Sequence, residues 1–353
     1  MGPVGDVAEG EGGSGSFVPG QLLMRFTANT STARRNQILA QEGATILKSY
    51  QTVPVLLVDL PDHVTNIVGA AGYWTAKPEV LYAEPNYIHN PFRTPNDSRF
   101  SEKWDLHNTG QPGGTQPGGT AGADIDAVAA WDIFTGTKDV VIAIIDTGTD
   151  TTHPDLVQNL WVNPGEIPGN GIDDDGNGYV DDINGWDFVN NDANPEDNVG
   201  HGTHVAGIAG AKGNNAVGVT GVAWDASLMI LKAGDPGFPL AAEVGAIDYA
   251  TTMRTRYGIN VVVSNNSYGG YNYSQALYDA IAAHTAAGIV FVAAAGNDAN
   301  NNDTTPSYPD GYNLPGIIAV AATDNRDQMA SFSNYGATTV DLGAPGVQIL
   351  STV

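Results

Sequence analysis

Cysteine is absent from the 353 residues, so no disulfide bond can cross-link this chain. A chain of this length can bury one large core and a smaller second unit without such bonds. If the protein works outside the cell, we expect bound metal ions to replace disulfides as cross-links.

Basic residues are also scarce: 14 Lys and Arg stand against 39 Asp and Glu, which gives a net charge of −25. This balance excludes nucleic acid and anionic membrane surfaces as partners, because both are bound through basic patches. The acidic excess suits a soluble protein that binds cations or works in salty or extracellular water, although solubility alone would explain it equally well.

Long apolar runs are missing too, and none approaches the ~20 residues that span a bilayer. Residues 1–16 have neither the basic start nor the apolar stretch of a signal peptide. Their Gly, Ser and Glu content predicts a flexible linker.

Two kinds of pattern are present, and they predict two units. The first, over residues 17–90, predicts the order β-α-β-β-α-β of a small α+β ferredoxin-like domain. A linker of polar residues with two prolines follows at 91–103. The expected strands are 21–26, 44–50, 53–61 and 80–87, and the expected helices are 30–43, which Thr30 or Ser31 caps and Gly43 ends, and 63–76.

The second pattern, over residues 104–353, alternates continuous apolar runs with helical stretches. Strands that are buried on both faces of a parallel sheet have this composition, so we predict a doubly wound, mainly parallel α/β domain. Catalytic groups in such domains gather beyond the carboxyl ends of the strands, where Asp146 and Asn297 lie. The apolar runs are 140–146, 227–233, 259–267 and 288–296, and the helical stretches are 201–211, 240–257 and 272–287.

The segment His-Gly-Thr-His at 201–204 is better suited to proton transfer than to zinc. No cysteine, no His-Glu-x-x-His and no nearby third ligand accompanies it. His201 opens a helix, whose N-terminus favours the neutral imidazole of a general base. Asp146 would orient that base, and His204 is interpreted as a structural histidine. The segment Asp146-Thr-Gly also begins the motif of aspartic proteases, but the parallel α/β pattern does not fit that class.

Six segments together resemble the subtilisin-like serine proteases. They are VVIAIIDTGTDTTHPDL, GHGTHVAGIAGA, NNAVGVTGVA, NNSYGG, FVAAAGN and APGVQILST, and they follow one another in the order of that family. Residues 17–90 resemble the family's inhibitory propeptide. The resemblance implies a secreted peptidase that acts on proteins or peptides, exists as a monomer and is inhibited by its own propeptide.

The resemblance assigns roles to individual residues. Asp146 and His201 match the acid and base of the catalytic triad, and Asn297 matches the side-chain donor of the oxyanion hole. Two segments match the walls of the S1 pocket, for which the family usually prefers a large uncharged side chain. These segments are Ser267-Tyr268-Gly269 and Ala294-Ala295-Gly296.

The family's nucleophile lies in a Gly-Thr-Ser-Met-Ala segment, and no serine of this chain has that context. Ser267 and Ser333 match other parts of the family. We therefore expect a chain truncated before its nucleophile and inactive by itself. Two other classes stay open: a pseudoprotease that binds peptides without cleaving them, and a calcium-dependent adhesion or structural protein.

Two segments predict Ca²⁺ sites. The run from Asp173 to Asn184 follows the start of an EF-hand loop, although Asn184 replaces the bidentate Glu at position twelve. The resemblance implies a second site at Asp155 and Asn215, together with carbonyl groups of 213–219. The predicted loop ligands are Asp173, Asp175, Asn177, Tyr179 (through its carbonyl), Asp181 and, in place of the missing Glu, Asp182.

Overall fold

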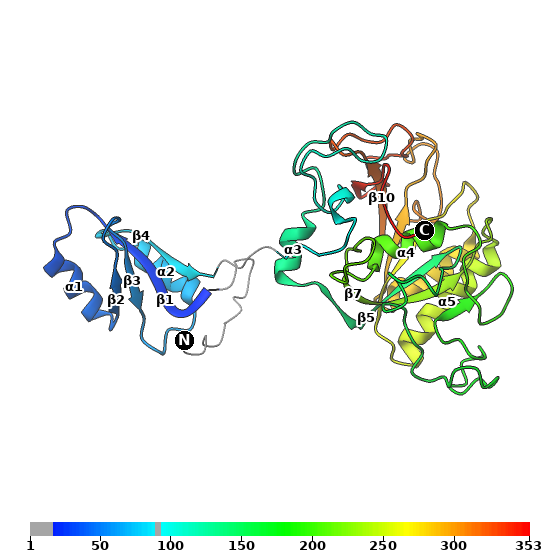
Figure 1. Ribbon diagram of the computed structural model, residues 1–353, viewed down its shortest axis with the longest axis horizontal. Coiled ribbons are helices and arrows are strands. Elements are labelled where there is room, and N and C mark those ends of the chain that lie inside the picture. Colours follow the sequence, from blue (N-terminus) through cyan, green and yellow to red (C-terminus); the bar gives the residue numbers. More distant parts are fainter. Residues whose placement is uncertain (1–16, 89–92) are drawn as a thin grey trace. The chain divides into compact units, whose positions relative to one another are not determined.

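The computed structural model describes residues 17–88 and 93–353, which divide into two compact units (Figure 1). The expected linker at 1–16 lies outside the described residues. No helix in the described part of the chain is both long and apolar enough to cross a membrane.

The first unit has the predicted β-α-β-β-α-β order. Its four strands form an antiparallel sheet in the order β2-β3-β1-β4, which is the ferredoxin-like arrangement. Ser31 caps the first helix by accepting a hydrogen bond from the Arg34 amide, and Gly43 follows that helix with φ 68°. The elements are β1 (Phe17–Phe26), α1 (Thr32–Gln41), β2 (Thr45–Ser49), β3 (Leu56–Asp59), α2 (Ile67–Thr75) and β4 (Val80–Tyr87).

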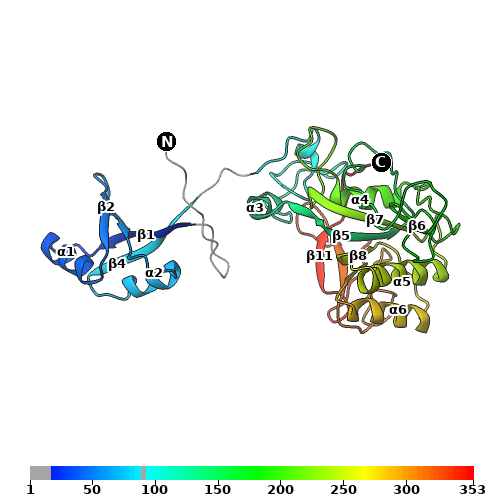
Figure 2. The same ribbon diagram turned by 90° about the horizontal axis from the view of Figure 1, so that it is seen from below.

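Both helices of this unit pack on one face of its sheet (Figure 2). Leu22 and Met24 alternate along β1 and are fully buried with Leu39 of α1 and Trp74 of α2. Alternate residues of a strand point to the same face, so one side of the sheet carries this core.

The second unit is built on a seven-stranded sheet in the order β11-β10-β9-β8-β5-β7-β6, and its paired strands are parallel. The predicted α/β class is therefore confirmed. The strands are β5 (Gly136–Asp146), β6 (Gly185–Asp187), β7 (Asp225–Lys232), β8 (Val261–Asn266), β9 (Val290–Ala294), β10 (Ile317–Thr323) and β11 (Leu342–Pro345). The helices are η1 (Phe100–Glu102), α3 (Ala127–Ile133), α4 (His201–Gly210), α5 (Leu240–Arg256) and α6 (Gln275–Ala286).

Helices cover both faces of this sheet, as Figure 2 shows for α4 on one side and α5 and α6 on the other. Ile145 of β5 packs in the cluster that holds Ile247 of α5 and Ile281 of α6, whereas its neighbour Ile144 packs in the cluster that holds Ala206 of α4. Because successive side chains of one strand enter two different cores, the whole run must be apolar.

The segment 96–103 lies within the expected linker 91–103, but in the structure it is packed against the second unit. Phe100 is buried beside Trp131, with ring centroids 5.9 Å apart. The Asn214 amide donates to Asp97, and the Arg99 amide donates to the Gly218 carbonyl. The polar composition of the expected linker, with its two prolines at 91 and 95, does not reveal that its second half has partners far along the chain.

The core between β9 and α6 offers a direct test of the packing. Phe291 has no exposed surface, so Phe291→Ala should lower the free energy of unfolding by about 3–5 kcal/mol. Val157 is 49% exposed, and Val157→Ala is the matched control, with an expected loss within about 0.5 kcal/mol. Urea unfolding followed by near-ultraviolet circular dichroism measures both, and equal midpoints for the two variants would contradict the assigned core.

Candidate active site

The structure brings Asp146 and His201 together as predicted from the sequence. Asp146 ends β5 in the middle of the sheet and is fully buried, and its Oδ1 lies 2.6 Å from Nδ1 of His201. The Thr147 amide also donates to this oxygen, at 2.8 Å. The imidazole is 49% exposed. One side of the ring therefore contacts the buried carboxylate, and the other side is open to solvent or to a bound molecule.

Close backbone packing fixes the start of α4 against the end of β5. The Gly202 amide donates to Thr147 Oγ1 at 2.9 Å, and a Cβ atom at Gly202 would lie 2.1 Å from the Gly148 carbonyl oxygen. Only glycine permits this approach. The Asp197 carboxylate accepts from the amides of Gly200 and Thr203, and so it caps the helix that carries His201.

The hydrogen bond from Asp146, assisted by its negative charge, raises the pKa of His201 although burial opposes this shift. We expected the helix N-terminus to favour the neutral ring. Instead the pKa of His201 is raised, and its hydrogen bond with Asp146 is the largest cause. The hydrogen bond fixes the orientation and tautomer of the ring and stabilises the imidazolium that forms after proton transfer. His204 contacts the Ile349 carbonyl at 3.0 Å, as a structural histidine would.

Asn297 follows β9 and shares a cavity of about 360 Å³ with His201. An adjoining pocket of about 240 Å³ contains all of the residues predicted to bind substrate, and Asn297 lines this pocket too. The six predicted residues are Ser267, Tyr268, Gly269, Ala294, Ala295 and Gly296. The carboxyl ends of β8 and β9 thus form one concave surface beside His201.

The two serines that line the cavity with His201, Ser267 and Ser333, have hydrogen-bond partners other than His201. Ser333 donates to the Asn334 carbonyl and accepts from the Ala322 amide, and Ser267 accepts from the Asn265 side chain. Within residues 17–88 and 93–353, no hydrogen bond joins a serine hydroxyl to His201.

Asp155 and Asn215 also lie together, and sequence analysis missed a third member of their cluster, Asp97. Asn215 Nδ2 donates to Asp155 at 2.8 Å. Asp97 is 5% exposed, and its Oδ1 is buried without a hydrogen-bond partner. Burial and the charge of Asp155 raise the pKa of Asp97. No sequence signal near Asp97 indicates this role, because Asp155 and Asn214 are both more than fifty positions away in the chain.

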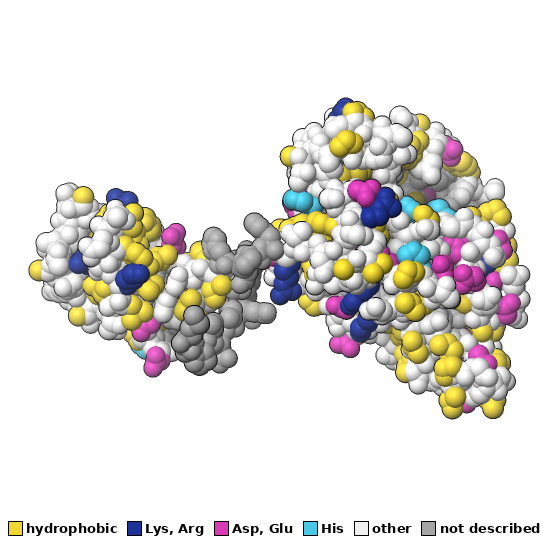
Figure 3. Space-filling view, in the orientation of Figure 1, with side chains coloured by type: hydrophobic (Ala, Val, Ile, Leu, Met, Phe, Trp, Pro, Cys, Tyr) yellow, Lys and Arg dark blue, Asp and Glu magenta, His cyan; other side chains and the backbone are white. Residues whose placement is uncertain are grey.

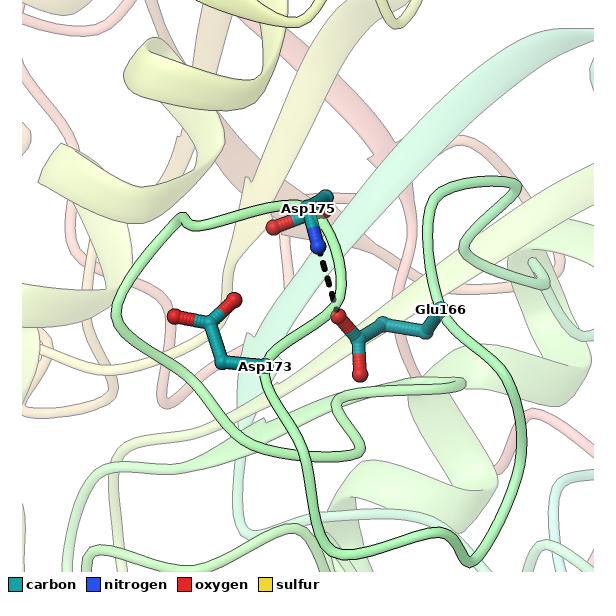
Figure 4. Close-up of side chains that lie close together, drawn as sticks. All are labelled: Glu166, Asp173 and Asp175. Atoms are coloured by element: carbon teal, nitrogen blue, oxygen red, sulfur yellow. Dashed lines mark hydrogen bonds between the residues drawn. The ribbon is translucent and has the colours of Figure 1, made fainter.

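The acidic loop after Gly171 has a different arrangement from the one predicted. Carboxylate oxygens of Glu166, Asp173 and Asp175 lie within 4.8 Å of one another (Figure 4). Glu166, which the EF-hand register does not include, accepts from the Asp174 and Asp175 amides at 2.8 and 3.3 Å. Asn177 remains close, because its side chain donates to Asp175 at 3.2 Å.

The other predicted loop ligands whose side chains were expected to bind, Asp181 and Asp182, have hydrogen-bond partners within the protein. Asp182 is fully buried. Its carboxylate accepts hydrogen bonds from the side chains of Asn163, Asn177 and Tyr249, as a structural carboxylate would. Burial raises the pKa of Asp182 to about 6. Asp181 accepts from the amides at 170 and 171, and the Tyr179 ring packs against Trp186. The loop also wraps around Glu166, whose Oε2 accepts from the Asp181 amide at 3.0 Å.

A buried carboxylate that is hydrogen-bonded to a half-exposed imidazole, beside an asparagine and two pockets, is an arrangement that can activate a nucleophile. Comparison with known proteins agrees. Residues 137–353 match the family model for the subtilase family, and residues 4–86 match that for the fervidolysin N-terminal prodomain.

Individual relatives give the same result. The chain is 36% identical to a thermophilic serine proteinase of Bacillus sp. strain AK1, over 96% of this chain and 72% of the relative. It is 38% identical to thermitase of Thermoactinomyces vulgaris, over 65% of this chain and 70% of the relative. A solved protease from Pseudoalteromonas arctica aligns with TM-score 0.53 and 28% identity, over 72% of this chain and 73% of that one. The chain belongs to the subtilase family and is a subtilisin-like serine protease with an N-terminal prodomain.

Replacing Asp146 by Asn tests the electrostatic link to His201. Asp146→Asn should lower the pKa of the imidazole, because the charge that stabilises its protonated form is lost. Since the folded-state pKa of His201 is raised, the pair stabilises the fold fully below the ordinary pKa of about 6.5 and loses this effect as pH rises through the folded value. Titration of the His201 ring proton by NMR measures the change.

Asp279→Asn is the matched control for that titration. Asp279 is on α6 and accepts from Gln275, and the variant removes the same charge outside the site. An unchanged His201 titration in Asp146→Asn would contradict the pair.

Proposed function

We propose that this protein is a calcium-stabilised serine endopeptidase in its pro-form, whose nucleophilic serine lies outside residues 1–353. The contact of 2.6 Å between Asp146 and His201, at the mouth of a cavity that Asn297 also lines, carries the proposal. An ion pair with only a structural role would need neither the exposed imidazole nor the adjoining groove.

Each residue has one step in the proposed reaction. His201 accepts the proton of the attacking serine and then donates it to the leaving amine. Asp146 holds the ring in place and stabilises the imidazolium. Asn297 donates a hydrogen bond to the oxyanion of the tetrahedral intermediate. The peptide substrate pairs with residues 267–269 as an added strand.

The first unit acts, in this proposal, as the inhibitor of the second. Its last strand, β4, leads into a segment that would occupy the substrate groove and be cleaved between Tyr87 and Ser98. We further propose an extracellular, monomeric enzyme, which the acidic surface favours by keeping copies apart.

The triad is tested on the native gene product with a fluorophosphonate probe, which labels only an activated serine. His201→Ala should abolish labelling and self-processing. Asn297→Ala should still be labelled but should lose about 10²–10³-fold in kcat, because one oxyanion donor is missing. The isolated chain 1–353 should not be labelled.

The same probe separates the other two classes. A pseudoprotease would bind peptides and remain unlabelled. A calcium-dependent adhesion protein would also be unlabelled, and chelation would remove its binding to partners rather than any hydrolysis. Full labelling and processing in His201→Ala would rule out the role that we assign to the histidine.

The residues around Asp97 fit a calcium ion. Two buried carboxylates, Asp97 and Asp155, have no Lys or Arg partner among the described residues, and one oxygen of Asp97 has no hydrogen bond. Oxygen donors of this charge suit Ca²⁺. A second site of the same chemistry is formed by Glu166, Asp173 and Asp175. Figure 3 shows acidic side chains gathered on one side of the second unit.

Removing calcium with a chelator should therefore lower the melting temperature. At calcium a hundredfold above Kd, a single site adds about 2.7 kcal/mol, equivalent to about 5–10 °C. In Asp97→Asn, chelation should lower the melting temperature less than in the wild type, because most of the contribution from this site is already lost. Calorimetric titration of the variant with Ca²⁺ should record one binding event fewer. Asp279→Asn again serves as the control, and an Asp97→Asn titration identical to that of the control would contradict the site.

A further inference from the structure

The pocket beside Asn297 is acidic. The walls of this cavity of about 240 Å³ include the carboxylates of Asp298 and Asp310, and no Lys, Arg or His contributes to them. Asp298 accepts a hydrogen bond from the Tyr271 hydroxyl. Asp310 comes from the loop after Ser307, which also lines the pocket.

Asp310 is the buried member of this pair. It is 4% exposed, and it accepts hydrogen bonds from the Ser307 hydroxyl at 2.7 Å and from the Asn302 side chain at 2.8 Å. The backbone amides of Asp310 and Gly311 also lower the pKa of this carboxylate, but all of these donors are neutral, so they solvate its charge without neutralising it. No cation pairs with it among the described residues. Burial raises its pKa, so the charge is held at a cost that a cationic ligand would offset.

A second pocket, of about 550 Å³, repeats this chemistry. Glu243 of α5 lines it, and no hydrogen bond to this carboxylate is present in the part of the chain that the structure describes. Burial raises the pKa of Glu243 to about 7. The remaining wall is rich in aromatic rings, with Phe238 stacked on Tyr268 at 4.6 Å. A carboxylate together with aromatic faces binds a cation better than it binds an aliphatic side chain.

The two pockets lie along one segment of backbone. Tyr268, Gly269 and Gly270 line both of them. Gly270 is paired with Tyr308 through two backbone hydrogen bonds of 2.8 and 2.7 Å, which hold the loop that carries Asp310 against this segment. A peptide added as a strand along 267–270 would therefore place two of its side chains in the two pockets.

We infer that the substrates are peptides with basic side chains at two positions: a Lys or Arg before the scissile bond, held by Asp310, and a second basic residue upstream, held by Glu243. This inference rests on the proposed peptidase function. It replaces the large uncharged P1 residue that the family resemblance implies, because an apolar side chain would leave the buried charge of Asp310 hydrogen-bonded but without a cationic partner.

Peptide cleavage by the native gene product tests the assignment. Fluorogenic peptides carry Arg, Lys, Phe or Leu at P1, and in a second series a single Arg moves through the upstream positions P2 to P5. The wild-type kcat/KM should be at least about tenfold higher for Arg than for Phe at P1, and Asp310→Asn should remove this difference. Glu243→Gln should instead remove the preference for Arg at one upstream position.

Asp279→Asn, which removes one charge from α6 outside both pockets, should leave both preferences within about twofold of the wild type. Circular dichroism of each variant shows whether the loop at 307–310 has kept its fold. If Asp310→Asn does not fold, the ratio of the wild-type kcat/KM values for Arg and Phe at P1 still tests whether the pocket prefers a basic side chain.

Binding of benzamidine, a small amidinium probe, gives a readout that does not need catalysis. Labelling by fluorophosphonate with a preference for Phe at P1 and no benzamidine binding would overturn this inference alone. An unlabelled protein that binds benzamidine, more weakly in Asp310→Asn, would overturn the proposed peptidase and keep the cation pocket. An unlabelled protein without benzamidine binding would overturn both.

Discussion

The carboxylate of Asp146 is buried at the end of a central strand, and the packing around it supplies the hydrogen bonds that a buried carboxylate needs. It ends the central strand β5, which β7 and β8 flank, so protein surrounds it on both sides. The His201 ring and the Thr147 amide supply hydrogen bonds to one of its oxygens. Because a buried carboxylate without partners is costly, the start of α4 must lie where it does. The same geometry makes His201 a base that is both oriented and exposed.

Local patterns in the sequence predicted the parts of the molecule that depend on neighbours in the chain. The apolar runs at β5, β7, β8 and β9 indicated a parallel sheet, since each run must fill two cores. The position of Asp146 at the end of such a run, with the helix start at His201, predicted their contact.

The two residues that the sequence did not indicate, Asp97 and Glu166, join their clusters from outside the segments whose spacing was considered. Asp97 faces Asp155, and Glu166 faces Asp175, yet nothing in the residues adjacent to Asp97 or Glu166 indicates those partners. The role of Asp182 as a loop ligand stays a prediction. Its spacing fits a loop register, but a buried tyrosine hydroxyl and two amide groups hold its side chain in the protein core.

The order of strands in the second unit has a consequence for how the chain reaches its folded state. β5 lies between β7 and β8, and β6 lies at the sheet edge beside β7, so each pairing closes a loop of many residues. Such topologies fold slowly, and apolar strands remain open to aggregation until they pair. All pairings of the first unit, including that of β1 with β4, lie within residues 17–87, and this unit precedes the second in synthesis. On a ribosome it would be complete while the larger sheet is still being assembled.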